Sequence, residues 1–174
     1  FSVRDPQAPQ PDLTAIKGKF PLLGVCFGAQ YLSHHFGGEV LPSNTREYGR
    51  AHLSFLDTSN VLTKGLTQGS QVWMSHGDHI EKEPNGFIVT SFSNKSVISS
   101  IENKKKMIFG LQFHPEVYHS LDGNKILSNF LINICKISTK FKLEDFLNNK
   151  INNLKNILKN KKVICGLSGG VDST

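Results

Sequence analysis

The sequence predicts an α/β fold, with one sheet flanked by helices and then the beginning of a second α/β domain. An apolar run at 20–26 (FPLLGVC) changes at once into a helical pattern at 28–36, which is typical of a buried strand that enters a helix. Strand-like and helix-like segments then alternate up to residue 135, as expected for this fold class. From residue 136 the composition shifts to lysine and asparagine, and a new apolar strand follows.

The elements of the first domain follow from spacing and composition. Residues 1–11 are rich in proline and glutamine and are expected to form an extended loop. The helix over 28–36 ends at Gly37-Gly38, a typical C-terminal stop. Residues 124–135 return to helical spacing. Five further segments are predicted to be strands: 51–55, 71–74, 87–92, 97–101 and 107–113. We expect a largely parallel sheet, with a more antiparallel insertion in the middle section as the alternative.

The second domain begins with a predicted linker helix. Leu147, Ile151, Leu154 and Leu158 are spaced by four, three and four residues, which gives an amphipathic helix. The segment 162–167 (KVICGL) then reads as the first strand of the new domain, and 168–174 (SGGVDST) as its glycine-rich exit loop. We place the domain boundary near residue 140, with domains at 1–138 and 139–174.

Bulk composition favours a cytoplasmic globular protein. The 38% hydrophobic content is enough to form a core, and no apolar run approaches the ~20 residues that span a bilayer. No targeting leader is visible. The chain begins at Phe1 rather than at methionine and stops at Thr174, directly after a glycine-rich stretch. We therefore expect a piece that is truncated at both ends.

Charge and cysteine content exclude further classes of function. The three cysteines are odd in number and form no CxxC pair, which indicates a reducing compartment and neither a disulfide framework nor a metal site. The net charge of +6 lies in residues 136–162, which hold eight lysines and two acidic residues. A solvated linker explains this charge better than a nucleic-acid groove, because Phe141 and Phe146 sit among apolar neighbours and read as packing residues.

Cys26 is the candidate nucleophile. It lies at the apex of the strand-to-helix turn GVCFGAQ (24–30), where Gly24 and Gly28 are expected to permit a close approach of the backbone. The turn exposes the sulfur at the positive end of a helix, which favours thiolate over thiol. Cys135 and Cys165 lack this setting and are interpreted as structural.

His114 and Glu116 are the candidate base and its orienting group. They follow the strand at 107–113, at the sheet edge where sites assemble in α/β folds. Pro115 biases His114 to an extended conformation, in which residues two apart project the same way. A carboxylate can then accept the imidazole N–H, as a cysteine hydrolase requires.

The other histidines carry weaker signals. His34, His35 and His52 are expected on the surface or as satisfied core residues, and His79 and His119 have no catalytic neighbours. His76 lies in SHGD (75–78), predicted to be a loop on the same sheet edge. Whether it contacts the substrate or a domain interface stays open.

The motifs GVCFGAQ (24–30) and FHPEV (113–117) together resemble the class I, triad-type glutamine amidotransferases. The resemblance implies that this sheet lacks its first strands and that the domain is a glutaminase, with Cys26, His114 and Glu116 as the catalytic triad. It also implies that the amino-acid end of glutamine is held by Gln30 and by the backbone around Ser75, His76 and Gly77. Phe27 would donate one oxyanion N–H. The family's second donor comes from a loop upstream of Phe1, so we expect weak or absent basal glutaminase activity from residues 1–174 alone.

The segment 168–174 resembles the pyrophosphate loop of the N-type ATP pyrophosphatases. Its residues are Ser168, Gly169, Gly170, Val171, Asp172, Ser173 and Thr174. Glycines let backbone N–H groups approach phosphates, the hydroxyls add donors, and the aspartate could meet a phosphate-bound Mg²⁺. A triad glutaminase upstream of such a loop resembles the glutamine-hydrolysing GMP synthetase family, as do TREYGRA (45–51) and VWMSHGD (72–78). This resemblance implies ATP, Mg²⁺ and XMP in the complete enzyme, and a homodimer formed through a missing C-terminal region.

Three alternative functions fit the sequence less well. Another triad amidotransferase or a γ-glutamyl hydrolase has no need of a pyrophosphate loop. A regulatory module that binds glutamine without hydrolysing it conflicts with the intact set of Cys26, His114 and Glu116. A nucleic-acid binder depends on the lysine-rich segment alone.

Overall fold

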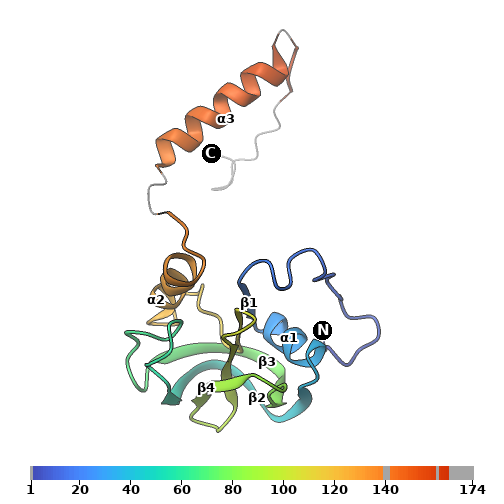
Figure 1. Cartoon of the computed structure of the whole chain (residues 1–174), viewed down its shortest axis with the longest axis vertical. Coiled ribbons are helices and arrows are strands. Elements are labelled where there is room, and N and C mark those ends of the chain that lie inside the picture. The colour runs from blue at the N-terminus through green and yellow to red at the C-terminus, as the bar shows by residue number, and fades with distance from the viewer. Residues whose placement is uncertain (1, 139–141, 160, 165–174) are drawn as a thin grey trace. The chain divides into compact units, whose positions relative to one another are not determined.

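The computed structural model describes residues 2–138, 142–159 and 161–164 (Figure 1). The chain divides into two compact units, at 1–137 and 138–174, one residue from the division that the composition suggests. Among the described residues, no helix combines the length and the apolar composition that a membrane span requires.

The first unit is built on a mixed sheet of six strands among the described residues. The strands are β1 (Leu22–Val25), β2 (Glu39–Leu56), β3 (Gln71–Lys82), β4 (Ile88–Ser93), β5 (Ile98–Asn103) and β6 (Ile108–Leu111). Their order is β1-β6-β5-β4-β2-β3. Only β1 and β6 pair in parallel, and all the other pairs are antiparallel.

The prediction of a largely parallel sheet is therefore wrong, and the antiparallel alternative holds for most of it. Short turns join β4 to β5 and β5 to β6, and such turns can connect only antiparallel neighbours. The pair β2–β3 is a long hairpin that runs from Glu39 opposite Lys82 to His52 opposite Gln71, with an irregularity between Pro42 and Glu47. The parallel pair β1–β6 remains, and it carries the two predicted catalytic motifs at its carboxyl ends.

Helices pack on both faces of the sheet. Side chains alternate along β6, so that its neighbouring residues contact helices on different faces. Helix α1 (Phe27–His35) follows β1, and its Ala29 and Leu32 share an apolar cluster with Ile108. Helix α2 (Gly123–Ser128) places Ile126 in a second cluster with Phe109 and Leu111, on the opposite face. Helix α1 ends as predicted, since Gly37 has φ +86 and its N–H donates to the carbonyl of His34.

The last helical segment of the first unit departs from the predicted single helix over 124–135. After Ser128 the chain widens into a π-helix, η1 (Asn129–Ile134). Phe130 and Ile134 still pack on the core, but Leu131 is exposed. The wider turn breaks the single apolar face that regular helical spacing gives.

The second unit contains the predicted linker helix, α3 (Leu143–Leu158), in which no residue is buried. The buried strand predicted at 162–167 is wrong over its described part. Residues 161–164 form no strand, and Ile164 is 98% exposed. A strand requires a hydrogen-bonding neighbour, and the described residues of this unit supply none. The rest of that segment and the loop 168–174 lie outside the described residues.

Candidate active site

Cys26 occupies a strained turn between β1 and α1. Its φ of 52° and ψ of −109° are unusual for a residue with a side chain, and its N–H donates to the carbonyl of Leu111 at 2.7 Å. A Cβ on Gly24 would lie 2.6 Å from the backbone of Gly28, so Gly24 must be glycine. Gly28 is not required in the same way, because a Cβ on Gly28 would meet nothing within 4 Å. The expected close approach of Gly24 and Gly28 is thus confirmed, but the expectation that a clash also excludes a side chain at Gly28 is wrong.

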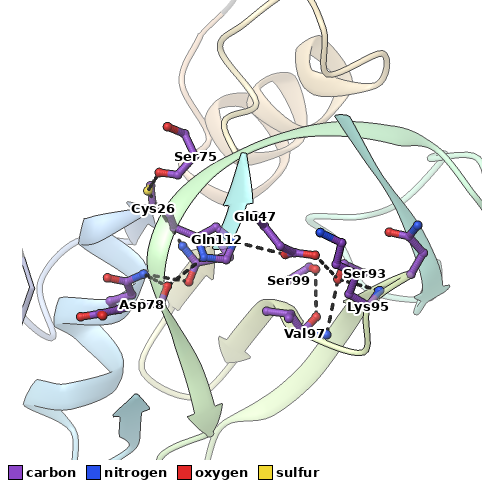
Figure 2. Close-up of polar contacts among 12 residues, drawn as sticks. Cys26, Glu47, Ser75, Asp78, Ser93, Lys95, Val97, Ser99 and Gln112 are labelled. Carbon is purple, nitrogen blue, oxygen red and sulfur yellow. Dashed lines mark hydrogen bonds and ion pairs between the residues drawn. The ribbon is translucent and has the colours of Figure 1, made fainter. Parts of the chain in front are cut away.

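The Cys26 sulfur is half-buried and contacts polar groups of Ser75, in β3, and of Gln112, which follows β6. It donates to the carbonyl oxygen of Ser75 at 3.5 Å, and the side-chain amide of Gln112 approaches it to 3.9 Å (Figure 2). Burial raises the pKa of the Cys26 thiol, the N–H of Phe27 opposes that rise, and the charge of Glu116 adds to it. The balance is a raised pKa, contrary to the expectation from the helix end alone. Thiolate formation at this cysteine therefore requires a proton acceptor.

His114 and Glu116 form a hydrogen-bonded pair immediately beyond β6. The imidazole Nδ1 lies 2.7 Å from the carboxylate Oε1 of Glu116. The backbone fixes His114 from both sides, since its N–H donates to the carbonyl of Trp73 and its carbonyl accepts from Ser120. With Nδ1 engaged by the carboxylate, Nε2 is the nitrogen that is free to take a proton. A carboxylate that holds one imidazole nitrogen in this way is the arrangement of a base and its orienting group.

A cavity of about 670 Å³ opens beside Cys26. All five residues that the family resemblance assigns to glutamine line it: Phe27, Gln30, Ser75, His76 and Gly77. Ser75 to Gly77 lie within β3, so the prediction that they form a loop is wrong. The strand continues through them because β2 pairs with it along this stretch, with Tyr48 opposite Ser75. A larger cavity of about 880 Å³ shares Pro42 and Ser43 with this one but is not lined by Cys26, and His114 lines neither of the two.

The cavity also contains charged residues that the sequence reasoning missed. Arg4 and Asp78 face each other at 3.2 Å, and Ser2 donates to the same carboxylate. A guanidinium and a carboxylate at one cavity suit the carboxylate and the ammonium group of a free amino acid. No local sequence pattern marks this pair, because its members are more than 70 residues apart.

His76 is buried, and its ring is held by protein groups. Nδ1 lies 2.8 Å from the carbonyl oxygen of Asp78, and Nε2 lies 3.3 Å from Oε2 of Glu47, without the alignment of a full hydrogen bond. Both side chains are at most 2% exposed. Burial raises the pKa of Glu47, but the facing His76 ring and the Ser93 hydroxyl outweigh it and lower that pKa. His76 thus reaches the cavity from an anchored position, and Glu47 is the partner that the sequence did not reveal.

The remaining histidines fit the expectation of structural or surface roles. His34, His35 and His52 are exposed. His79 pairs with Glu81 at 2.9 Å, and His119 stacks on Trp73 with ring centres 4.3 Å apart.

Comparisons with known proteins agree with this geometry. The family model for class I glutamine amidotransferases matches residues 3–134. Proteins named GMP synthase [glutamine-hydrolyzing] match all 174 residues, at 47% identity in Phocaeicola vulgatus and 45% in Flavobacterium psychrophilum. The chain spans only 34% of the length of each of these relatives.

Solved structures give the same fold. A Thermoplasma acidophilum protein described as a component of a GMP synthase superposes with a TM-score of 0.63 at 31% identity, over 76% of this chain and 61% of that one. A glutamine amidotransferase of Thermotoga maritima has a TM-score of 0.50 at 22% identity, over 80% of this chain and 57% of that one, and its likeness concerns the fold alone.

Proposed function

The chain belongs to the class I glutamine amidotransferases, and we propose that it is the glutaminase part of a glutamine-hydrolysing GMP synthase. The observation that supports this most directly is the placement of Cys26, at the apex of a strained turn beside a cavity with a charged pair. The similarity of all 174 residues to part of enzymes of that name supports XMP as the proposed acceptor of the ammonia.

In the proposed reaction, His114 takes the proton of the Cys26 thiol through Nε2, and the sulfur attacks the side-chain amide carbon of glutamine. Negative charge develops on the amide oxygen, where the N–H of Phe27 can donate. His114 returns its proton to the leaving nitrogen, and ammonia departs. Water then hydrolyses the γ-glutamyl thioester and releases glutamate, with Glu116 holding the imidazole throughout.

The amino-acid end of glutamine lies in the cavity beside Cys26 in this proposal. Arg4 faces its carboxylate, and Asp78 with the backbone of Ser75 to Gly77 faces its ammonium group. The Arg4–Asp78 contact opens toward the ligand when glutamine binds, so each member exchanges a protein partner for a substrate partner.

For the whole protein we propose a second reaction, in which the released ammonia is transferred to XMP. ATP, with Mg²⁺, activates XMP by adenylation, and ammonia displaces AMP to give GMP. Residues 168–174 are proposed to contact the ATP phosphates, and a homodimer and a cytoplasmic location are part of the same proposal. Support comes from the resemblance of SGGVDST to a pyrophosphate loop and from the named relatives.

Labelling with a diazoketone analogue of glutamine tests the nucleophile. The expected result is a thioether on Cys26, formed with loss of N₂, that excess glutamine suppresses and that Cys26→Ser lacks. Peptide mass spectrometry locates the label, and Cys135 in the same sample is the control for non-specific alkylation. Labelling of Cys135 at the same rate as Cys26, unaffected by glutamine, would contradict the proposal.

A further inference from the structure

Gln112 is a buried polar residue beneath the candidate nucleophile that the reaction described above does not use. It follows β6 directly, its backbone N–H donates to the carbonyl of Ser99 at 2.9 Å, and it is 1% exposed. Buried side-chain amides are costly unless they are hydrogen-bonded. The partners of this amide therefore indicate what it does.

A chain of hydrogen bonds fixes which way the Gln112 amide points. The Gln30 Nε2 lies 2.7 Å from the carbonyl oxygen of Asp78, which can only accept, so this atom is a nitrogen. The same Nε2 lies 3.1 Å from Oε1 of Gln112. A flipped Gln112 would set two NH₂ groups against each other. Its oxygen must therefore face Gln30, and its NH₂ must face the sulfur of Cys26 (Figure 2).

This orientation matters because the sulfur lies between an acceptor and a donor. The thiol proton points to the carbonyl of Ser75, and the Gln112 N–H points to the sulfur itself. When the proton leaves, the Ser75 contact loses its hydrogen, while the Gln112 N–H remains and strengthens against a negative sulfur. A donor in this position favours the charged form of the group that it faces.

We propose that Gln112 is a positioning residue, whose amide N–H holds the Cys26 sulfur at the apex of the turn and stabilises its thiolate. Gln30 and the carbonyl of Asp78 are the supports that orient it. The proposal rests on the proposed role of Cys26 as the nucleophile. It also gives the buried Gln30 a function other than contact with glutamine, because both bonds of its Nε2 are made within the protein.

The other ionisable groups at the site are all retained in the Gln112 variants. They are His114 and Glu116 beyond β6, His76 and Asp78 of β3, and Arg4 of the N-terminal segment. The difference between wild type and a Gln112 variant therefore reports on the amide. Burial, which raises the pKa of Cys26, acts in both.

The test is the pH dependence of iodoacetamide alkylation at Cys26 in the full chain, followed on the peptide that contains it. For Gln112→Leu the titration midpoint is expected to rise by about one pH unit, with roughly tenfold slower alkylation at pH 7 and an equal rate at high pH. Gln112→Glu keeps the oxygen that faces Gln30 and sets a second oxygen against the sulfur, so its midpoint is expected to rise further.

Asn129→Leu is the matched control, because it also removes a hydrogen-bonded side-chain amide, which donates to the carbonyls of Leu62 and Lys64 and lies in η1. Its midpoint at Cys26 is expected to equal that of wild type. Circular dichroism checks that each variant folds. If Gln112→Leu does not fold, the titration midpoint of Gln112→Glu tests the proposal in its place. A midpoint within about a third of a unit of wild type in the folded variant would overturn the proposal. Alkylation needs no glutamine, so this result is independent of diazoketone labelling.

Discussion

At the scale of single residues, the contact between Glu47 and His76 connects the cavity wall to the interior of the sheet. Removing the Glu47 carboxylate leaves the buried Nε2 of His76 without a facing polar group, and a buried polar group left in this way typically costs about 1–3 kcal/mol. Glu47→Ala is therefore expected to lower the free energy of unfolding by about that amount, measured by urea denaturation at pH 7. The exposed pair of His79 and Glu81 is the control, since Glu81→Ala should cost less than about 1 kcal/mol. Equal costs for the two variants would contradict this account.

The two glycines of the turn give a second test at this scale. A Cβ on Gly24 would lie 2.6 Å from the Gly28 backbone and 2.7 Å from the Leu32 side chain, so Gly24→Ala must displace α1 from β1. Overpacking of this kind typically costs about 1–3 kcal/mol. Gly28→Ala meets open space in a helix, where alanine is the better residue by about 1 kcal/mol, and is expected to leave stability unchanged or raised. Thermal unfolding of both variants measures the difference in stability. A larger loss of stability for Gly28→Ala than for Gly24→Ala would contradict the requirement for glycine at position 24 alone.

The candidate catalytic residues could be identified from the sequence because each lies in a short local motif. Cys26 has glycines at fixed offsets, and His114 and Glu116 sit together after an apolar strand. Glu47 and Asp78 lie inside the segments TREYGRA and VWMSHGD, but nothing local identifies their contacts, because the partners of Glu47, Asp78 and Gln112 are distant in sequence. Such contacts can be predicted only once the sheet is known.

At the scale of elements, Asp122, the residue before α2, ties the loop between β2 and β3 to that helix. This carboxylate accepts from the backbone N–H of Thr67 and pairs with Lys125 at 2.8 Å. Burial raises the pKa of Asp122, but these contacts outweigh it and lower that pKa. A lowered folded-state pKa stabilises the protein above the unfolded value of about 3.9, and the contribution is lost as the pH falls through the folded value.

Asp122→Asn is therefore expected to be less stable than wild type at pH 7, by about 1 kcal/mol, and to approach it below pH 4. Urea denaturation at pH 7, 5, 4 and 3 measures the difference. Asp12, Glu47 and Asp57 also have lowered pKa values, so both proteins still lose stability in acid. A difference in stability that stays constant across this range would contradict the role given to the carboxylate.

Elements with strong periodicity could be predicted, and those that depend on their neighbours could not. Helices α1 and α3 follow from apolar spacing and, for α1, from the glycine at its end. The segment 75–78 reads as a loop because its residues are polar and include glycine, yet β2 holds it in β3 through backbone hydrogen bonds. Backbone pairing does not depend on the side chains there, so local composition misleads.

At the scale of the whole molecule, the fold brings two distant motifs to one edge of the sheet. Cys26 directly follows β1 and His114 lies beyond β6, the two strands that pair in parallel. The sequence predicted this edge, since strand-to-turn motifs at the carboxyl ends of parallel strands meet. It could not predict the antiparallel order of the other strands, because register and pairing depend on contacts between distant segments.

The central claim is that Cys26 releases ammonia for an ATP-dependent synthesis of GMP. The most direct measurement is GMP formation from XMP and ATP by the complete protein, with glutamine or with ammonium, in wild type and in Cys26→Ala. We expect the variant to lose glutamine-dependent synthesis by more than about a hundredfold and to keep the ammonium-dependent reaction. Survival of the glutamine-dependent reaction in the variant would contradict the assignment of the nucleophile, and failure of the wild-type protein to form GMP from either nitrogen source would contradict XMP as the acceptor.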